Sequence, residues 1–91
     1  MTVRWSDRAL RDVAGIYDYI AADSEDAALR TSDRLFEAGE RLGIMPRLGR
    51  PSQLRRRREL IVDPYIILYS VHCDEVRIYS VHHGARQRGG R

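Results

Sequence analysis

Three short segments in the second half of the chain are rich in β-branched and aromatic residues and lie very close together in sequence. They are residues 58–62 (RELIV), 65–71 (YIILYSV) and 75–81 (EVRIYSV). This composition is typical of β-strands. A connection between parallel strands needs about a dozen residues or more, whereas Asp63-Pro64 and the stretch HCDE (72–75) are far shorter. We therefore predict an antiparallel three-stranded meander.

The first half of the chain has apolar residues at steps of three and four, which indicates helices. The first helix is expected over about residues 7–22, with Ser6 as its N-cap, and the second from Asp23 or Ser24 to Gly43, before Pro46. Their apolar stripes are Ala9, Leu10, Val13, Ala14, Ile16, Tyr17 and Ile20, and then Ala28, Thr31, Leu35, Ala38 and Leu42. The short polar turn between the helices predicts an antiparallel hairpin.

The predicted order is β-α-α-β-β-β, because residues 2–5 (TVRW) read as a short strand and residues 45–57 as a loop. We expect a single α+β domain over residues 1–91, in which the helix hairpin forms one layer and the antiparallel meander the other. Two layers that close on each other bury both apolar faces, and a chain of 91 residues can form only one modest core.

The charge of the chain is uneven and all of its basic residues are arginine. Residues 1–44 hold six arginines and nine acids, a net charge of −3, and residues 45–91 hold ten arginines and four acids, a net charge of +6. A basic half of this kind indicates an anionic partner, either nucleic acid or an acidic protein. The single cysteine, Cys73, allows no internal disulfide, and the longest apolar run, residues 65–69, is too short to span a membrane. We expect a cytoplasmic protein.

The segments ALRDVAGIYDYIAADSEDAA, MPRLGRP, RELIV with PYIILYSV, and VRIYSVHHGARQ together resemble the RelE/ParE toxin superfamily, and most closely its ParE-type branch. The resemblance covers about residues 5–87 and rests on the order and spacing of these segments. It implies a toxin of a type II toxin–antitoxin pair, with two helices on an antiparallel sheet and the N-terminal strand beside the last one. RelE-type members cleave messenger RNA on the ribosome, whereas characterised ParE-type members inhibit DNA gyrase.

An arginine run before the first strand of the meander is the strongest candidate for partner binding, because guanidinium groups suit phosphates and carboxylates. The alternative interpretation is a solvated rim that only aids solubility. Tyr65 and Tyr69 share one strand face and could stack on bases or contact a partner, although packing in the core is the alternative. The residues predicted to bind a partner or nucleic acid are Arg47, Arg50, Arg55, Arg56, Arg57, Arg58, Tyr65 and Tyr69. We expect Glu59 to pair with an arginine of a neighbouring strand.

The resemblance also suggests a catalytic alternative in the segment HHGAR, residues 82–86. His83 would act as the acid or base, and Arg58, Arg77 and Arg86 would hold the scissile phosphate. The simpler interpretation is a strand-end histidine and exposed arginines. Several RelE-type ribonucleases use lysines for proton transfer, but this chain has none, and an arginine is always protonated. This difference favours the ParE branch.

No cofactor or metal is expected, since the spacing of the histidines and of Cys73 matches no zinc site. Together with the arginine run and the missing lysines, the resemblance implies a ParE-like toxin that poisons DNA gyrase by binding and is neutralised by a ParD-like or RelB-like antitoxin. The antitoxin is expected to cover the groove between the helix hairpin and the sheet. A ribosome-dependent ribonuclease and a non-catalytic nucleic-acid-binding module are the alternative functions.

Overall fold

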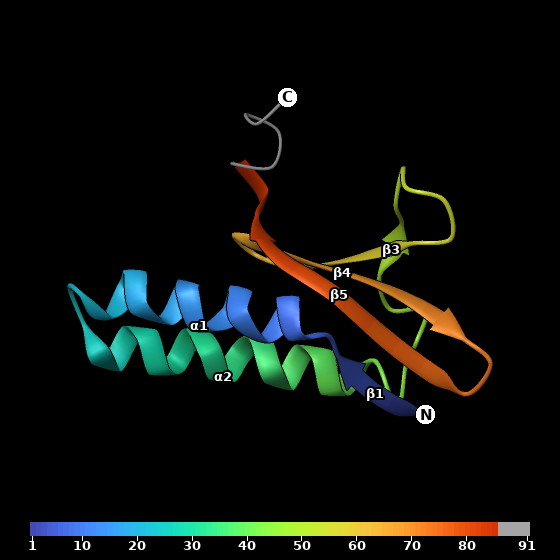
Figure 1. The fold of residues 1–91 in the computed structure, drawn as a ribbon, viewed down its shortest axis with the longest axis horizontal. Coiled ribbons are helices and arrows are strands. Elements are labelled where there is room, and N and C mark those ends of the chain that lie inside the picture. Colours follow the sequence, from blue (N-terminus) through green and yellow to red (C-terminus); the bar gives the residue numbers. More distant parts are fainter. Residues whose placement is uncertain (86–91) are drawn as a thin grey trace.

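The computed structural model describes residues 1–85 and confirms the predicted α+β order. The elements are β1 (Thr2–Trp5), α1 (Asp7–Ala21), α2 (Glu25–Arg41), β2 (Arg50–Pro51), β3 (Arg58–Val62), β4 (Tyr65–His72) and β5 (Glu75–His83). Figure 1 shows α1 and α2 side by side against one face of the sheet.

The strands form one mixed sheet in the order β1-β5-β4-β3-β2. As predicted, β3, β4 and β5 are antiparallel neighbours and β1 lies beside β5. The β1 strand runs parallel to β5, so the sheet is mixed and not antiparallel throughout. The prediction of an uninterrupted loop over residues 45–57 is wrong, because Arg50 and Pro51 pair with β3 as a two-residue edge strand. A strand this short, with a proline in it, has too little periodicity to be recognised from sequence.

Serine side chains begin both helices. The Ser6 hydroxyl accepts a hydrogen bond from the backbone N–H of Ala9 at 2.9 Å and donates one to the carbonyl oxygen of Tyr79 at 2.8 Å. The Ser24 hydroxyl accepts from the N–H of Ala27 at 3.1 Å. Ser6 thus caps α1 and also fixes the start of that helix to β5, while Ser24 alone of the two predicted candidates caps α2.

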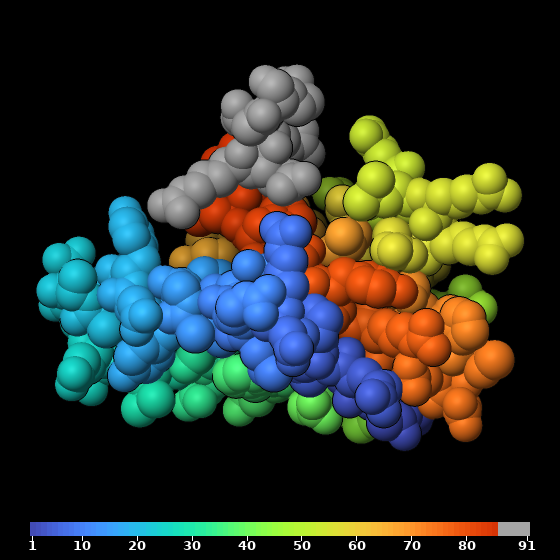
Figure 2. Space-filling view, in the orientation of Figure 1, coloured from blue at the N-terminus to red at the C-terminus, as the bar shows by residue number. Residues whose placement is uncertain are grey.

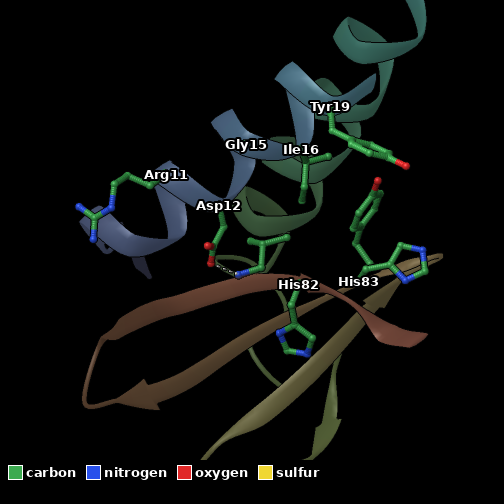
Figure 3. Close-up of a pocket in the computed structure, with 9 residues that line it drawn as sticks. Arg11, Asp12, Gly15, Ile16, Tyr19, His82 and His83 are labelled. Carbon is green, nitrogen blue, oxygen red and sulfur yellow. Dashed lines mark hydrogen bonds between the residues drawn. The ribbon is translucent and has the colours of Figure 1, made fainter. Parts of the chain in front are cut away.

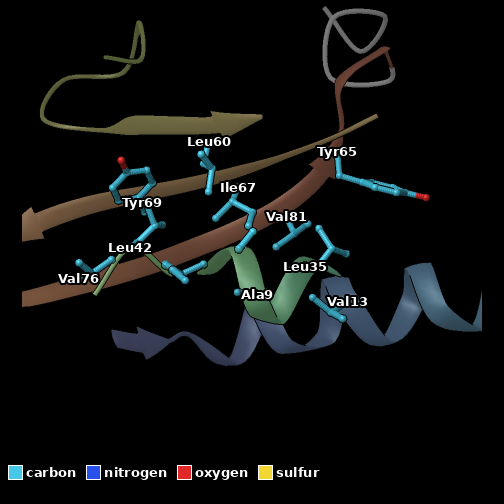
Figure 4. Close-up of a cluster of buried hydrophobic side chains, with 12 residues drawn as sticks. Ala9, Val13, Leu35, Leu42, Leu60, Tyr65, Ile67, Tyr69, Val76 and Val81 are labelled. Carbon is cyan, nitrogen blue, oxygen red and sulfur yellow. The ribbon is translucent and has the colours of Figure 1, made fainter. Parts of the chain in front are cut away.

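The core lies between the helix hairpin and the covered face of the sheet (Figure 4). Its buried members are Ala9, Val13, Leu35, Ala38, Leu42, Leu60, Tyr65, Ile67, Tyr69, Val76, Ile78 and Val81. The stripe of α1 is rotated from the predicted one, because Leu10 is 43% exposed whereas Ala9 and Val13 are buried. Small residues at the contact let the helix backbones approach the sheet closely. A Cβ on Gly39 would lie 2.3 Å from the ring of Trp5.

The opposite face of the sheet carries the other half of the alternating side chains. In the strand register Arg4 stands beside Arg77, and Arg77 stands beside Ser70. Arg77 and Ser70 are each next in sequence to buried core residues and therefore point to the opposite face. Both helices lie on the other side of the sheet (Figure 1). We call this the open face. Because successive side chains of a strand point to opposite faces, its residues are fixed by the same register that builds the core.

Candidate functional site

The loop between β2 and β3 turns tightly and presents arginine side chains at one end of the molecule. The N–H of Ser52 donates to the carbonyl of Arg57 at 2.9 Å, and the N–H of Arg57 donates to that of Leu54 at 3.1 Å. Arg56, at the turn, has a φ of 61°. Figure 2 shows this loop projecting in yellow at the end opposite the α1–α2 turn.

Three arginines of this region are exposed, and within residues 1–85 their guanidinium groups make no hydrogen bond or ion pair. These are Arg47, Arg55 and Arg56, which we call the arginine rim. Arg50 is exposed as well, but it pairs with Glu59 of β3 at 3.3 Å, as expected for Glu59. The rim groups are free to bind carboxylate or phosphate oxygens from outside.

Arg57 and Arg58 are half-buried and already have partners inside the protein. The guanidinium carbon of Arg57 lies 3.9 Å from the centre of the Tyr79 ring. Arg58 donates to the carbonyl oxygens of Gly49 at 2.7 Å and Arg47 at 3.4 Å, and its buried Nε atom has no hydrogen-bond partner among residues 1–85. The predicted cluster of consecutive arginines is therefore divided into an exposed part and a part that supports the loop.

Tyr65 and Tyr69 are buried, so neither ring is displayed on the surface as a stacking platform. The Tyr69 side chain is fully buried. Its hydroxyl donates to the carbonyl of Pro46 at 2.7 Å and accepts from the N–H of Gly49 at 2.9 Å. The sequence could not show which face of β4 the helices cover. In the structure they cover the face that carries both tyrosines. Tyr69 instead fixes the segment that leads into β2.

The residues of the catalytic alternative are not brought together. Arg77 stands beside Ser70 in the sheet and Arg58 beside Tyr69, whereas His83 stands beside Tyr65. Tyr65 and Ser70, which stand opposite His83 and Arg77, are five residues apart in β4. At about 3.3 Å per residue, His83 and Arg77 are therefore roughly 17 Å apart along the sheet. Arg77 also lies on the open face and pairs with Glu75. Arg86, the fourth candidate, lies outside the described residues.

A groove of about 670 Å³ lies between α1 and the ends of β4 and β5 (Figure 3). Its lining residues are Arg11, Asp12, Gly15, Ile16, Tyr19, Tyr65, Val81, His82 and His83. We call it the helix-side groove. Outside its own helix turn, no atom of residues 1–85 lies within 4 Å of the position that a Cβ on Gly15 would take, so the missing side chain widens the groove. The resemblance predicts a groove between the helix hairpin and the sheet, and Gly15, within the apolar pattern of the first helix, marks where it widens.

Polar contacts hold the two walls of the groove in place. One carboxylate oxygen of Asp12 accepts from the backbone N–H of Val81 at 2.9 Å, which ties α1 to β5, and also lies 3.7 Å from Arg8. The His83 ring meets the Tyr65 ring edge-on at 5.5 Å, and its Nδ1 accepts from the N–H of Ala85 at 3.2 Å. His83 is thus held at the strand end, as the simpler interpretation of this residue expected.

His82 occupies the opposite side of the same strand. Figure 3 shows its ring on the sheet face turned away from α1. Burial lowers the pKa of His82, while the charges of Glu59 and Asp12 act in the raising direction. The imidazole is therefore neutral over a wider pH range than a free histidine.

No group of three or more histidine, cysteine or acidic side chains within residues 1–85 is placed to hold a metal ion. None of the described helices is both long enough and apolar enough to cross a membrane.

Known proteins match this chain over nearly its whole length. Residues 3–88 match the family described as ParE toxin of the type II toxin-antitoxin system parDE. The chain is 40% identical over 87 residues to "Putative toxin Y4kP" of Sinorhizobium fredii, covering 93% of this chain and 90% of that protein. It is 39% identical over 84 residues to "Toxin RelE2" of Caulobacter vibrioides, covering 92% and 96%.

A solved structure shares the fold. It is described as the chromosomal ParDE TA system from P. aeruginosa, and it superposes with a TM-score of 0.80 at 25% identity, covering 91% of this chain and 95% of that one.

Proposed function

This chain belongs to the ParE toxin family of type II toxin–antitoxin systems, and from that premise we propose that it arrests growth by binding and poisoning DNA gyrase in the cytoplasm. The observation that carries the proposal is the arginine rim, in which the guanidinium groups of Arg47, Arg55 and Arg56 are exposed and bind no group of residues 1–85. Hydrogen bonds from Arg58 and Tyr69 hold the adjacent segment in place. Such a surface is suited to binding rather than to proton transfer.

The proposal is also supported by the separation of the nuclease candidates. A general acid or base must reach the reacting group within hydrogen-bond distance or through one water. His83 lies near the helix-side groove, while Arg77 lies on the open face. A single phosphate would not contact both side chains in this arrangement.

We further propose that a cognate ParD-like antitoxin neutralises the toxin by occupying the helix-side groove. The groove runs along α1 and offers an apolar floor, with Ile16 and Val81, next to Arg11 and His83. An amphipathic helix that lays its apolar side in a groove is a common mode of peptide recognition. The solved relative described as a ParDE system supports the choice of partner.

DNA supercoiling by purified gyrase tests the target. The proposal expects the toxin to abolish supercoiling when it is in molar excess over gyrase, and an equimolar antitoxin to restore it. Toxin denatured and then removed by centrifugation serves as the control for contaminants. Gyrase that supercoils normally at a large toxin excess would defeat the gyrase proposal.

A ribosome-dependent ribonuclease remains the second candidate, because a relative that is 39% identical carries the name Toxin RelE2. Under this alternative a His83→Ala variant would lose growth inhibition while remaining folded by circular dichroism. Retained growth inhibition by that variant would remove the ribonuclease candidate centred on His83.

A further inference from the structure

A carboxylate of the protein itself lies between two arginines on the open face. One oxygen of Glu75 accepts a hydrogen bond from Nε of Arg77, and the other lies 4.0 Å from Nε of Arg4. The two arginines are lateral neighbours in β1 and β5. Their side chains are 69% exposed for Arg4 and 46% exposed for Arg77, whereas Glu75 is 25% exposed. The arrangement shows that a carboxylate fits between these two guanidinium groups.

Hydroxyl groups continue the polar region on the next strand. Ser70 stands beside Arg77 in the register, and its buried hydroxyl shares a hydrogen bond of 2.8 Å with the hydroxyl of Tyr79. The guanidinium of Arg57 covers the Tyr79 ring at 3.9 Å. Three arginines, from β1, β5 and the β2–β3 loop, thus contribute positive charge to one side of the sheet.

Apolar side chains lie farther across the same face. Ile61 is 46% exposed although it lies in a strand, and it stands beside Ile66 of β4. Leu68, two residues along β4 from Ile66, is half-buried. The aliphatic groups of β3 and β4 thus lie on the same face as the arginines of β1 and β5, next to His82 and the Arg50–Glu59 pair.

We propose that the open face is a docking surface for an acidic, amphipathic segment of a protein partner, whose carboxylate replaces that of Glu75 between Arg4 and Arg77 while its apolar side chains cover Ile61, Ile66 and Leu68. Charge complementarity carries the choice of occupant, because the guanidinium pair already binds a carboxylate. Glu75 acts as an internal competitor that weakens binding of any outside carboxylate.

The aromatic chemistry of this face favours a protein segment over single-stranded nucleic acid. Proteins bind single strands by stacking bases on exposed aromatic rings. The Tyr79 ring is covered by Arg57, the His82 ring on the same face (Figure 3) is half-buried, and the aliphatic side chains there are those of Ile61, Ile66 and Leu68. Aliphatic side chains match apolar side chains of a partner and give bases little to stack on.

The docking surface and the helix-side groove lie on opposite sides of the sheet. Figure 3 shows the groove between α1 and β5, and the register places Arg4 and Arg77 on the side away from the helices. A partner on the open face would therefore leave room for an antitoxin in the groove. The inference does not depend on which target the toxin inhibits.

Fluorescence anisotropy with a labelled synthetic peptide tests the proposal. The probe carries a block of glutamates next to a block of leucines, and two further peptides replace the glutamates by glutamine or the leucines by serine. The unmodified probe should bind the toxin more tightly than either control peptide. Glu75→Gln should tighten its binding by roughly two- to fivefold, because the competing carboxylate is removed, and Arg77→Gln or Arg4→Gln should weaken it by a similar factor.

Arg30→Gln is the matched control, because Arg30 is exposed on α2 and the substitution removes the same charge away from the sheet. Circular dichroism before each titration shows that the variants are folded. Unchanged or weaker binding to Glu75→Gln would overturn the proposal, and so would equal binding of the glutamine peptide. Tighter binding of a single-stranded oligothymidylate than of the acidic peptide, with the same dependence on Glu75, would replace it with a nucleic-acid site.

Discussion

Arg55 and Arg56 are exposed at the tip of the β2–β3 loop, whereas Arg57 and Arg58, the next two residues, are half-buried and held by the protein itself. The guanidinium groups of the first pair make no hydrogen bond or ion pair within residues 1–85. In the second pair, one guanidinium covers the Tyr79 ring and the other donates to backbone carbonyls of residues 47 and 49. Four identical side chains thus serve two purposes, presentation of charge and support of the loop that presents it.

The division follows from the backbone. Arg56 adopts a left-handed conformation, with a φ of 61°, which reverses the chain direction before β3 begins at Arg58. Alternation in and next to β3 then sends Arg57 toward the open face and Arg58 toward the covered face, beside Tyr69. A run of like charges in a sequence therefore overstates the charge that is free to bind.

Of the substitutions in residues that support the loop, removal of the Tyr69 hydroxyl should give the largest loss of stability. Tyr69→Phe would leave the N–H of buried Gly49 and the carbonyl of Pro46 without their partner. An unsatisfied buried polar group costs about 1–3 kcal/mol, so the free energy of unfolding should fall by that amount. Urea denaturation measures it. A loss below about 0.5 kcal/mol, the range of ordinary surface changes, would contradict the supporting role.

Arg58→Gln should destabilise the protein by about 1–2 kcal/mol, because the carbonyls of Arg47 and Gly49 lose a charged donor that is only half-buried. The matched control is Arg55→Gln, which removes the same charge from the exposed pair. It should change the free energy of unfolding by less than about 0.5 kcal/mol. Equal effects in the two variants would show that the arginines are not divided as described.

Arg56→Gly should separate stability from binding. A non-glycine residue in the left-handed region costs about 1–2 kcal/mol, and glycine at position 56 would remove that cost. The greater freedom of glycine in the unfolded chain offsets about 0.5–1 kcal/mol of this gain. The variant should therefore be more stable by roughly 0.5 kcal/mol in thermal unfolding, yet bind gyrase more weakly because it lacks a rim arginine. Tighter binding would contradict the rim as the contact surface.

Low pH should weaken the Glu75–Arg77 pair on the open face, and its effect on stability should be smaller than those of the substitutions above. The hydrogen bond from Arg77 lowers the pKa of Glu75 below the ordinary value of 4.5. This pairing stabilises the folded state above pH 4.5 and is lost as the pH falls through the lower folded value. Glu75→Gln should therefore show a shallower loss of stability below pH 4.5 than the unmodified protein. Identical acid profiles would indicate that the pair contributes nothing measurable.

Much of the fold could be predicted from the sequence. Ser6 and Ser24 precede regular apolar stripes, and the short connections at residues 63–64 and 72–75 leave only antiparallel pairing for the later strands. The pairing of β1 with β5 followed from the family resemblance, since no local pattern encodes a contact between the two ends of a chain. Leu10 was placed in the core because periodicity does not show how far a helix is rotated.

The candidate site was less predictable, for reasons visible in single residues. Alternation placed Tyr65 and Tyr69 on one strand face, but only the docked helices decide that this face is buried. The environment of Arg57 depends on Tyr79, which is distant in sequence. Asp12, which ties α1 to β5 in the groove, looks like any exposed helix carboxylate in the sequence. Contacts between distant segments set the chemistry of each of these side chains.

Supercoiling assays with two variants test the central claim, that the toxin acts by binding through its exposed arginines, most directly. One variant combines Arg55→Gln and Arg56→Gln, and the other is His83→Ala. The account predicts that the double variant needs about tenfold more toxin for half-inhibition of gyrase, as loss of about 1.4 kcal/mol of binding implies, while His83→Ala inhibits like the unmodified toxin. Full inhibition by the double variant, together with loss of inhibition in His83→Ala, would contradict the claim.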